Sequence, residues 1–295
     1  MTAMKRYGIL LVAVLLCMAC NKEHTTTLPD DAAMRFEMKH PATRATATAF
    51  EQGDRIGLYI TEYDGDAAAP LQISGNWANN VAASLDGELW TTAKKIFWSD
   101  SKMDVYGYYP YMTPVSIDEQ PFAVALDQST ERNGDQLGGY EASDFLWAKS
   151  EGVAQTEGTV ALQFAHCCSK LVVKLVKGPS YEGDLPDNAT IYIHSVVPTA
   201  TIDFTTGVVV KDLFGEMATI KTRKIDNATY EAIIVPQRLD SRRPFIEVVV
   251  NGVSYLLEDT FNFKAGKQHT LSLTINSNPD QVEIEIGGEI EGGWN

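Results

Sequence analysis

The chain has 295 residues, 44% hydrophobic and 21% charged, which is enough apolar material for a sizeable core. At roughly 100–200 residues per domain, this length allows two domains or one large one. The formal net charge of −15 gives a surface that repels phosphate backbones and anionic lipid headgroups, so nucleic acid is not expected as a partner.

The first residues have the layout of an export signal. Lys5 and Arg6 precede the apolar run YGILLVAVLL, which is too short to span a bilayer but long enough for a signal peptide. Ala19, a small residue, then precedes Cys20, an arrangement that resembles a bacterial lipoprotein signal. We therefore expect residues 1–19 to be removed and Cys20 to be lipidated, so that the exported protein meets the membrane only through this anchor. The alternative is a plain secretory signal with an incidental cysteine.

A tether is expected over residues 20–49, which are rich in Thr, Ala and Asp. It contains one strand-like alternation, in which Met34, Phe36 and Met38 share one face and charged residues share the other. The alternative for this stretch is an apolar patch without regular structure. A lone basic residue, Arg44, follows among small residues, where a protease can reach an extended chain.

Strand signals dominate the chain from residue 50 onwards, and no long helical periodicity occurs. Strands are expected in aromatic or β-branched runs at 54–60, 103–112, 158–165, 170–177, 189–197, 229–237, 244–257 and 267–276. Short strands with polar turns favour β-sandwiches, each of which takes roughly 100 residues. The sequence therefore predicts an all-β protein with two sandwiches in tandem, at 50–157 and 158–279, divided near SEGVAQTEG.

Turn residues separate several of these strands. Asn251 and Gly252 can supply the positive φ angles of a tight hairpin. A second turn is expected in DFTTGVVV, at 203–210. The last segment, residues 280–295, follows the final strand of the second domain and is not expected to be needed for that sheet. It alternates glutamates with three apolar residues, Val282, Ile284 and Ile286.

Motifs for catalysis or cofactor binding are missing from the sequence. There is no P-loop, GxGxxG, GxSxG or HExxH pattern, and the histidines lack metal-ligand spacing. Cys167 and Cys168 are adjacent, so a disulfide between them would close a small strained ring, and we expect buried or half-buried thiols. His166 is expected to be structural, because catalytic Cys–His pairs are not defined by adjacency in sequence. The sequence thus predicts no enzyme, no cofactor and no metal.

The ordered set of motifs resembles one known family. TRATATAFEQGDRIGLYI, IFWSDSKMDVYGYYPY, DFLWA, VALQFAHCCSKLVVKL, ATIDFTTGVV, YEAIIVPQ and FNFKAGKQHTLSLTI occur in the order seen in the fimbrillin-like lipoproteins of Bacteroidetes, the subunits of type V pili and their relatives. The resemblance runs from about residue 43 to the C-terminus. It implies two transthyretin-like β-sandwich domains and an outer membrane lipoprotein exposed on the cell surface or in a fimbria.

The resemblance also implies an assembly mechanism. An Arg-specific protease would cut between Arg44 and Ala45, which removes the plug strand with Met34, Phe36 and Met38. The groove left behind would accept the C-terminal strand of a neighbouring fimbrial subunit, here the donor strand with Val282, Ile284 and Ile286.

Two alternatives remain beside a stalk subunit: a tip adhesin, and a monomeric surface lipoprotein that binds a host or glycan receptor. The aromatic residues Trp77, Trp98 and Tyr108 could stack on sugars in such a protein, although aromatic residues more often pack in β-cores.

Overall fold

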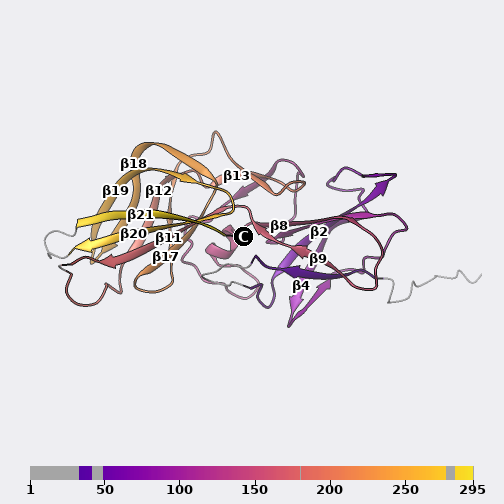
Figure 1. The fold of residues 1–295 in the computed structure, drawn as a ribbon, viewed down its shortest axis with the longest axis horizontal. Coiled ribbons are helices and arrows are strands. Elements are labelled where there is room, and N and C mark those ends of the chain that lie inside the picture. The colour runs from indigo at the N-terminus through magenta and orange to yellow at the C-terminus, as the bar shows by residue number, and fades with distance from the viewer. Residues whose placement is uncertain (1–32, 42–48, 180, 277–282, 295) are drawn as a thin grey trace, which may run out of the picture.

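The computed structural model describes residues 33–41, 49–179, 181–276 and 283–294. The molecule is elongated, and its sheets gather in two halves (Figure 1). Within the described residues, the only helix is α1 (Gly139–Ser143), and strands make up the rest of the regular structure. The all-β prediction is therefore confirmed.

The first half is built on a seven-stranded antiparallel sheet in the order β10-β8-β6-β2-β4-β5, with β3 paired to β2. Its strands are β2 (Arg55–Asp64), β3 (Ala67–Ala68), β4 (Ala78–Asp86), β5 (Leu89–Thr92), β6 (Met103–Tyr109), β8 (Leu146–Val153) and β10 (Ala165–His166). Every residue of β6 is buried, because alternate side chains enter different cores on the two faces of the sheet. Met103 and Val105 face one core, and Tyr106 and Tyr108 face the other.

A two-stranded parallel sheet, formed by β1 (Arg35–Lys39) and β9 (Thr159–Gln163), covers one face of this sheet. Together they enclose the N-terminal core, which consists of Met34, Phe36, Met38, Ile56, Leu58, Ile60, Ala78, Val81, Ala83, Ile96, Met103, Val105, Tyr109, Leu146, Ala148, Val160, Leu162 and Phe164. Gly107 permits the close approach of the two layers, since a Cβ there would meet Phe164 at 2.9 Å and Leu162 at 3.0 Å.

The second half contains a five-stranded and a four-stranded sheet (Figure 1). The five-stranded sheet, in the order β16-β17-β11-β20-β21, consists of β11 (Ser169–Lys177), β16 (Arg223–Lys224), β17 (Thr229–Ile234), β20 (Lys267–Asn276) and β21 (Glu283–Gly293). The four-stranded sheet, in the order β15-β12-β18-β19, consists of β12 (Thr190–Val196), β15 (Ala218–Lys221), β18 (Gln237–Val250) and β19 (Val253–Phe263). Their inner faces share the C-terminal core, whose members include Leu171, Val173, Ile191, Ile193, Phe245, Val248, Leu271 and Leu273.

A three-stranded antiparallel sheet links the two halves. It pairs β7 (Gln120–Ala123), from the first half of the chain, with β13 (Thr199–Asp203), which also pairs with β14 (Val208–Lys211). At its hairpin, Gly207 packs so close to Trp147 of β8 that a Cβ would lie 2.7 Å from the indole ring.

The predicted boundary between residues 157 and 158 falls just before β9 (Thr159–Gln163). Strand β9, expected to open the second domain, pairs with β1 and lies in the N-terminal core. The second half begins with β11. SEGVAQTEG contains the end of β8 and the loop that leads to β9, so its polarity reflects exposure of a connection between two packed strands. Polar composition alone does not distinguish such a loop from a linker.

Other local predictions hold. Asn251 and Gly252 form the β18–β19 turn with φ angles of 51° and 77°, as a primed turn requires. Leu271, Leu273 and Ile275 of β20 are buried, as the alternation predicts. The C-terminal strand β21 pairs antiparallel with β20 of the same chain and forms the outer strand of that sheet.

Candidate functional site

The predicted plug strand is a packed strand in this structure. Met34, Phe36 and Met38 are 6%, 8% and 8% exposed, whereas Arg35 and Glu37 face outward. Burying a side chain of this size contributes roughly 1.5–3 kcal/mol, so the three together anchor the strand firmly. The alternation read from the sequence is therefore confirmed as a strand with one apolar face, although its removal is not tested by this observation.

Two chain segments flank β1. On one side it pairs with β9, with Phe36 opposite Val160 and Met38 opposite Leu162. On the other side, the backbone N–H of Met34 donates to the carbonyl oxygen of Ile96 at 2.8 Å, and Ala33 forms a bridge with Phe97. Strand β1 thus fills a slot between β9 and the 96–97 segment, above the N-terminal core.

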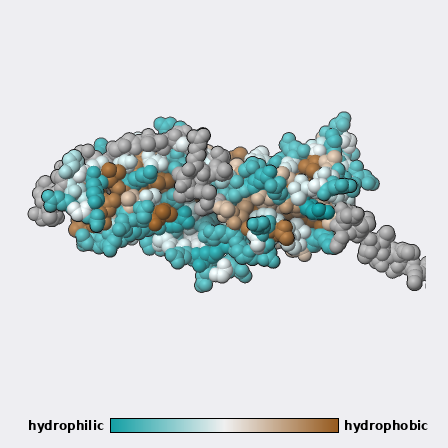
Figure 2. Space-filling view, turned by 60° about the horizontal axis from the view of Figure 1, so that its bottom comes forward, coloured by the Kyte–Doolittle hydropathy of each residue, from teal (hydrophilic) through white to brown (hydrophobic). Residues whose placement is uncertain are grey.

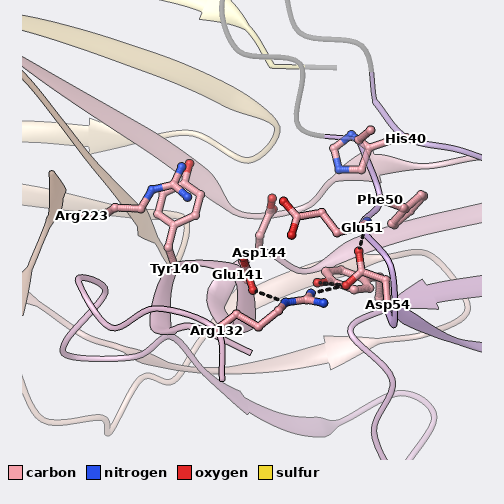
Figure 3. A pocket seen from close by; sticks show the side chains of 11 residues that line it. His40, Phe50, Glu51, Asp54, Arg132, Tyr140, Glu141, Asp144 and Arg223 are labelled. Atoms are coloured by element: carbon pink, nitrogen blue, oxygen red, sulfur yellow. Dashed lines mark hydrogen bonds and ion pairs between the residues drawn. The ribbon is translucent and has the colours of Figure 1, made fainter. Parts of the chain in front are cut away.

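The chain leaves β1 beside a small pocket of about 60 Å³, which we call the joint pocket (Figure 3). Its lining includes His40, Phe50, Asp54, Arg132, Glu141 and Asp144. These residues come from the end of β1, the approach to β2, and α1 with its neighbouring loops. The pocket therefore lies where the N-terminal segment meets the rest of the molecule.

An internal charge network closes the floor of the joint pocket. The guanidinium of Arg132 donates to the carboxylate of Asp54 and, at 3.1 Å, to that of Glu141, while the hydroxyl of Tyr109 donates to Asp54 at 3.2 Å (Figure 3). Burial alone would lower the pKa of Arg132, but the bonds to the two carboxylates outweigh it and the pKa is raised. Burial raises the pKa of Tyr109. The network thus holds a fixed cation and a neutral phenol, which suits structural support.

His40 lines this pocket, and its ring contacts that of a second histidine, His166. The Nδ1–H of His166 donates to Asp144 at 2.8 Å, and the ring of His40 meets that of His166 edge to face at 5.7 Å between centroids. The pKa of His40 is lowered, mainly by burial, although its bond to the carbonyl oxygen of Pro41 opposes the shift. His40 is therefore held as a neutral ring by its surroundings.

Of the adjacent thiols, Cys168 is buried and Cys167 is half-buried, and both are protonated. Burial raises the pKa of Cys167 to about 12, and the pKa of Cys168 is raised as well for the same reason. A neutral thiol is a poor nucleophile and metal ligand, which agrees with the predicted packing role. In the part of the chain that the structure describes, no group of three or more His, Cys, Asp or Glu side chains could hold a metal ion.

The aromatic residues proposed for sugar stacking do not form one platform. Tyr108 is 1% exposed, and its hydroxyl donates to Asn80 and to the carbonyl oxygen of Met112. Trp98 packs against the N-terminal core, and only Trp77 is substantially exposed, at 44%. Tyr108 is thus a core residue, because it lies on the central strand β6, both faces of which are covered.

The structure brings together only part of the predicted site. The plug-strand residues share one slot, whereas Cys20, Arg44, Ala45 and Val282 lie outside the described residues. Ile284 and Ile286 lie in β21, opposite Ile275 and Leu273 of β20. Sequence reasoning missed the joint pocket, since its charged residues stand alone in polar loops and carry no local pattern.

The surface is mixed in character. Apolar side chains form small separate patches among polar ones on the face shown in Figure 2. None of the described helical residues forms a span long and apolar enough to cross a membrane.

Comparison with known proteins identifies the fold and the family. The chain matches a crystal structure of a candidate cell adhesion protein from Bacteroides uniformis with a TM-score of 0.66 and 22% identity, over 91% of this chain and 100% of that one. A similar protein from Bacteroides ovatus matches with a TM-score of 0.66 and 19% identity, over 90% and 99% of the two chains. A fimbrial protein from Bacteroides ovatus matches with a TM-score of 0.50 and 17% identity, over 84% of this chain and 51% of that one.

No curated protein matches the chain significantly. At these identities the structural matches establish a shared fold. The fimbrillin-like family, in contrast, matches the sequence over residues 43–293, a range that begins after β1 and contains every later strand through β21. On this match, the chain belongs to the fimbrillin-like family.

Proposed function

We propose that the protein is a structural subunit of a cell-surface fimbria that assembles by strand exchange after its N-terminal segment is removed. Membership of the fimbrillin-like family supports a fimbrial or adhesive role, export to the cell surface and association with other fimbrial subunits. The role is structural and not catalytic. The observation that carries the proposal is β1, a short terminal strand with one buried apolar face in a slot of its own.

Removal of β1 would turn this slot into an acceptor groove. It would uncover the apolar face of the N-terminal core and leave backbone groups of β9 and the 96–97 segment without their partners. An extended strand with alternating apolar residues can satisfy both demands, since its backbone supplies register and its side chains fill alternate pockets. The spacing of Val282, Ile284 and Ile286 in the sequence matches that of Met34, Phe36 and Met38. We therefore assign the donor role to the C-terminal strand of a neighbouring subunit.

Processing is assigned to the bond between Arg44 and Ala45, by an Arg-specific protease. Limited trypsin digestion of the purified protein should give early, selective cleavage and a chain that begins at Ala45. An Arg44→Ala variant should resist this cut and fail to assemble, whereas a Lys22→Ala variant, which removes another basic tether residue, should behave as the wild type. Assembly of Arg44→Ala at the wild-type rate, with the bond before Ala45 intact, would refute this step.

The anchor is assigned to Cys20, as an outer membrane lipoprotein requires. A Cys20→Ala variant should move from the membrane fraction to the soluble fraction. Wild-type protein whose Cys20 is found unmodified by mass spectrometry would exclude the lipid anchor and leave only a secretory signal.

A tip adhesin is the second candidate. It is favoured by the loop after β14, where Leu213 and Phe214 are 82% and 95% exposed. The backbone N–H of Phe214 donates to the carboxylate of Asp212 at 2.9 Å, which fixes this loop. An ordered loop with such exposed apolar side chains is typical of a contact surface. Electron microscopy of cells with and without the protein separates the two roles, because loss of a stalk subunit removes the fibre and loss of a tip subunit removes only its end.

A further inference from the structure

The C-terminal strand ends in a buried tryptophan. Strand β21 runs along β20 towards the middle of the molecule, where the two halves meet (Figure 1). After the last strand pair, between Lys267 and Gly293, the N–H of Trp294 donates to the carbonyl oxygen of Gly266 at 3.3 Å. The side chain of Trp294 is 2% exposed and belongs to the C-terminal core. The end of the outermost strand is therefore docked.

The partner of this tryptophan is His166, which also contacts His40 of the joint pocket. The indole of Trp294 stacks face to face on the imidazole of His166, with centroids 3.8 Å apart and planes inclined by 7°. His166 is 3% exposed, and its bond to Asp144 fixes the orientation of its ring. A flat ring in a fixed orientation is a specific stacking site for an aromatic side chain, and we call it the seat of Trp294.

A second ring from the N-terminal segment contacts the same imidazole. His40 comes directly after β1 and meets His166 edge to face, with centroids 5.7 Å apart and an interplanar angle of 76°. His40 in turn meets Phe50 at 4.8 Å and 79°. One continuous chain of rings thus runs from Trp294 through His166 and His40 to Phe50. Residues near both ends of the described chain thus contact one imidazole.

We propose that His166 and Asp144 form a docking site for the chain's own C-terminal tryptophan, and that the N-terminal segment completes this site through His40. Loss of the N-terminal segment removes the edge-to-face contact and opens one side of His166 to water, which loosens the seat of Trp294 and with it the end of β21. This inference rests on the proposed function, in which β1 is removed and the C-terminal strand moves to a neighbour. It adds that the same event which opens the groove also releases the donor.

Hydrogen–deuterium exchange of the purified monomeric protein measures this coupling without any assembly. A His40→Ala variant should raise the exchange rate of β20 and β21 amides about 2- to 10-fold, the effect of losing one aromatic contact. The amides of β12 and β18, which pair in the other sheet, should not change. The matched control is Lys39→Ala, the neighbouring residue, whose side chain is 48% exposed. A His40→Phe variant keeps a ring edge and should restore protection.

A double-variant cycle separates coupling from general loosening. In a Trp294→Ala background, His40→Ala should have no further effect on β20 and β21, because the seat is already empty. Unchanged exchange of β21 in His40→Ala, together with raised exchange in Trp294→Ala, would overturn the proposal, and so would additive effects in the double variant. Absence of fibres would refute strand exchange but would not alter these exchange rates, so the two failures are distinguishable.

Discussion

The first and last strands of the structure are held in opposite ways. Strand β1 has five residues and lies in a slot of its own over the N-terminal core, where Phe36 and Met38 are buried together with Met34, which precedes the strand. Strand β21 has eleven residues and lies at the outer edge of a five-stranded sheet, along β20. Loss of β1 therefore uncovers a core, whereas loss of β21 uncovers an edge. Strand exchange needs both an apolar groove that can accept a strand and a strand that can leave its own sheet. The N-terminal part of the chain provides the first, and the C-terminal part provides the second.

The largest expected effect is the loss of assembly when the C-terminal strand is deleted. Removal of residues 280–295 takes away β21 but leaves β20 paired with β11, so the protein should remain a folded monomer that forms no fibres by size-exclusion chromatography and electron microscopy. The control is Trp294→Ala, which keeps the donor strand and should still assemble. Fibres from the truncated chain would show that β21 is not the donor, and unfolding would show that its own sheet requires it.

Loss of the central plug residue should have the next largest effect. A Phe36→Ala variant removes a side chain that is 8% exposed in the N-terminal core, and such substitutions cost about 3–5 kcal/mol of stability. Because β1 has only one strand partner, much of this cost should appear as local release, measured as faster cleavage near β1 in limited proteolysis. Glu37→Ala, on the exposed face of the same strand, should change stability by less than about 0.5 kcal/mol. Equal effects of the two variants would show that β1 is not held by its apolar face.

Local periodicity was sufficient to find both strands but not to place them. The alternation at Met34, Phe36 and Met38 predicts a strand with one apolar face, and the structure has one. That pattern does not predict that the strand pairs with β9, which lies more than a hundred residues later in the chain. The same limit applies to β21, whose alternation fits either its own sheet or a neighbour's groove. Period-2 patterns specify which face is apolar, and long-range pairing decides what covers it.

A related reason explains why the joint pocket could not be predicted from the sequence. Asp54 and Arg132 are 78 positions apart, and each stands in a polar stretch typical of loops. SEGVAQTEG likewise has the composition of a linker, although it connects β8 to β9, which pack around one core. Features made by two distant segments have no signal in either segment alone.

The smallest expected effect is a pH dependence that should distinguish the two terminal strands. His40 has a lowered pKa when docked, chiefly because of burial and secondarily because of His166, while the Pro41 carbonyl and the carboxylates of Asp144 and Asp54 oppose the shift. The undocked segment has the ordinary pKa of 6.5 and therefore binds more protons as the pH falls below that value. Docking of β1 should be strongest above pH 6.5 and weaken as the pH falls through the lowered pKa, by at most about tenfold per pH unit for one proton.

Hydrogen–deuterium exchange of β1 amides at pH 7.5 and 5.5, corrected for the intrinsic pH dependence of exchange, measures this effect. A His40→Gln variant, which cannot titrate in this range, provides the control and should show no such loss of protection. Because His40 and Trp294 both contact His166, the exchange rates of the β21 amides should change with pH as those of β1 do in the wild type. They should not do so in the variant. Equal pH dependence in both proteins would place the titrating group elsewhere. Loss of protection in β1 without any change in β21 would mean that the two ends of the chain, although they touch one imidazole, respond separately.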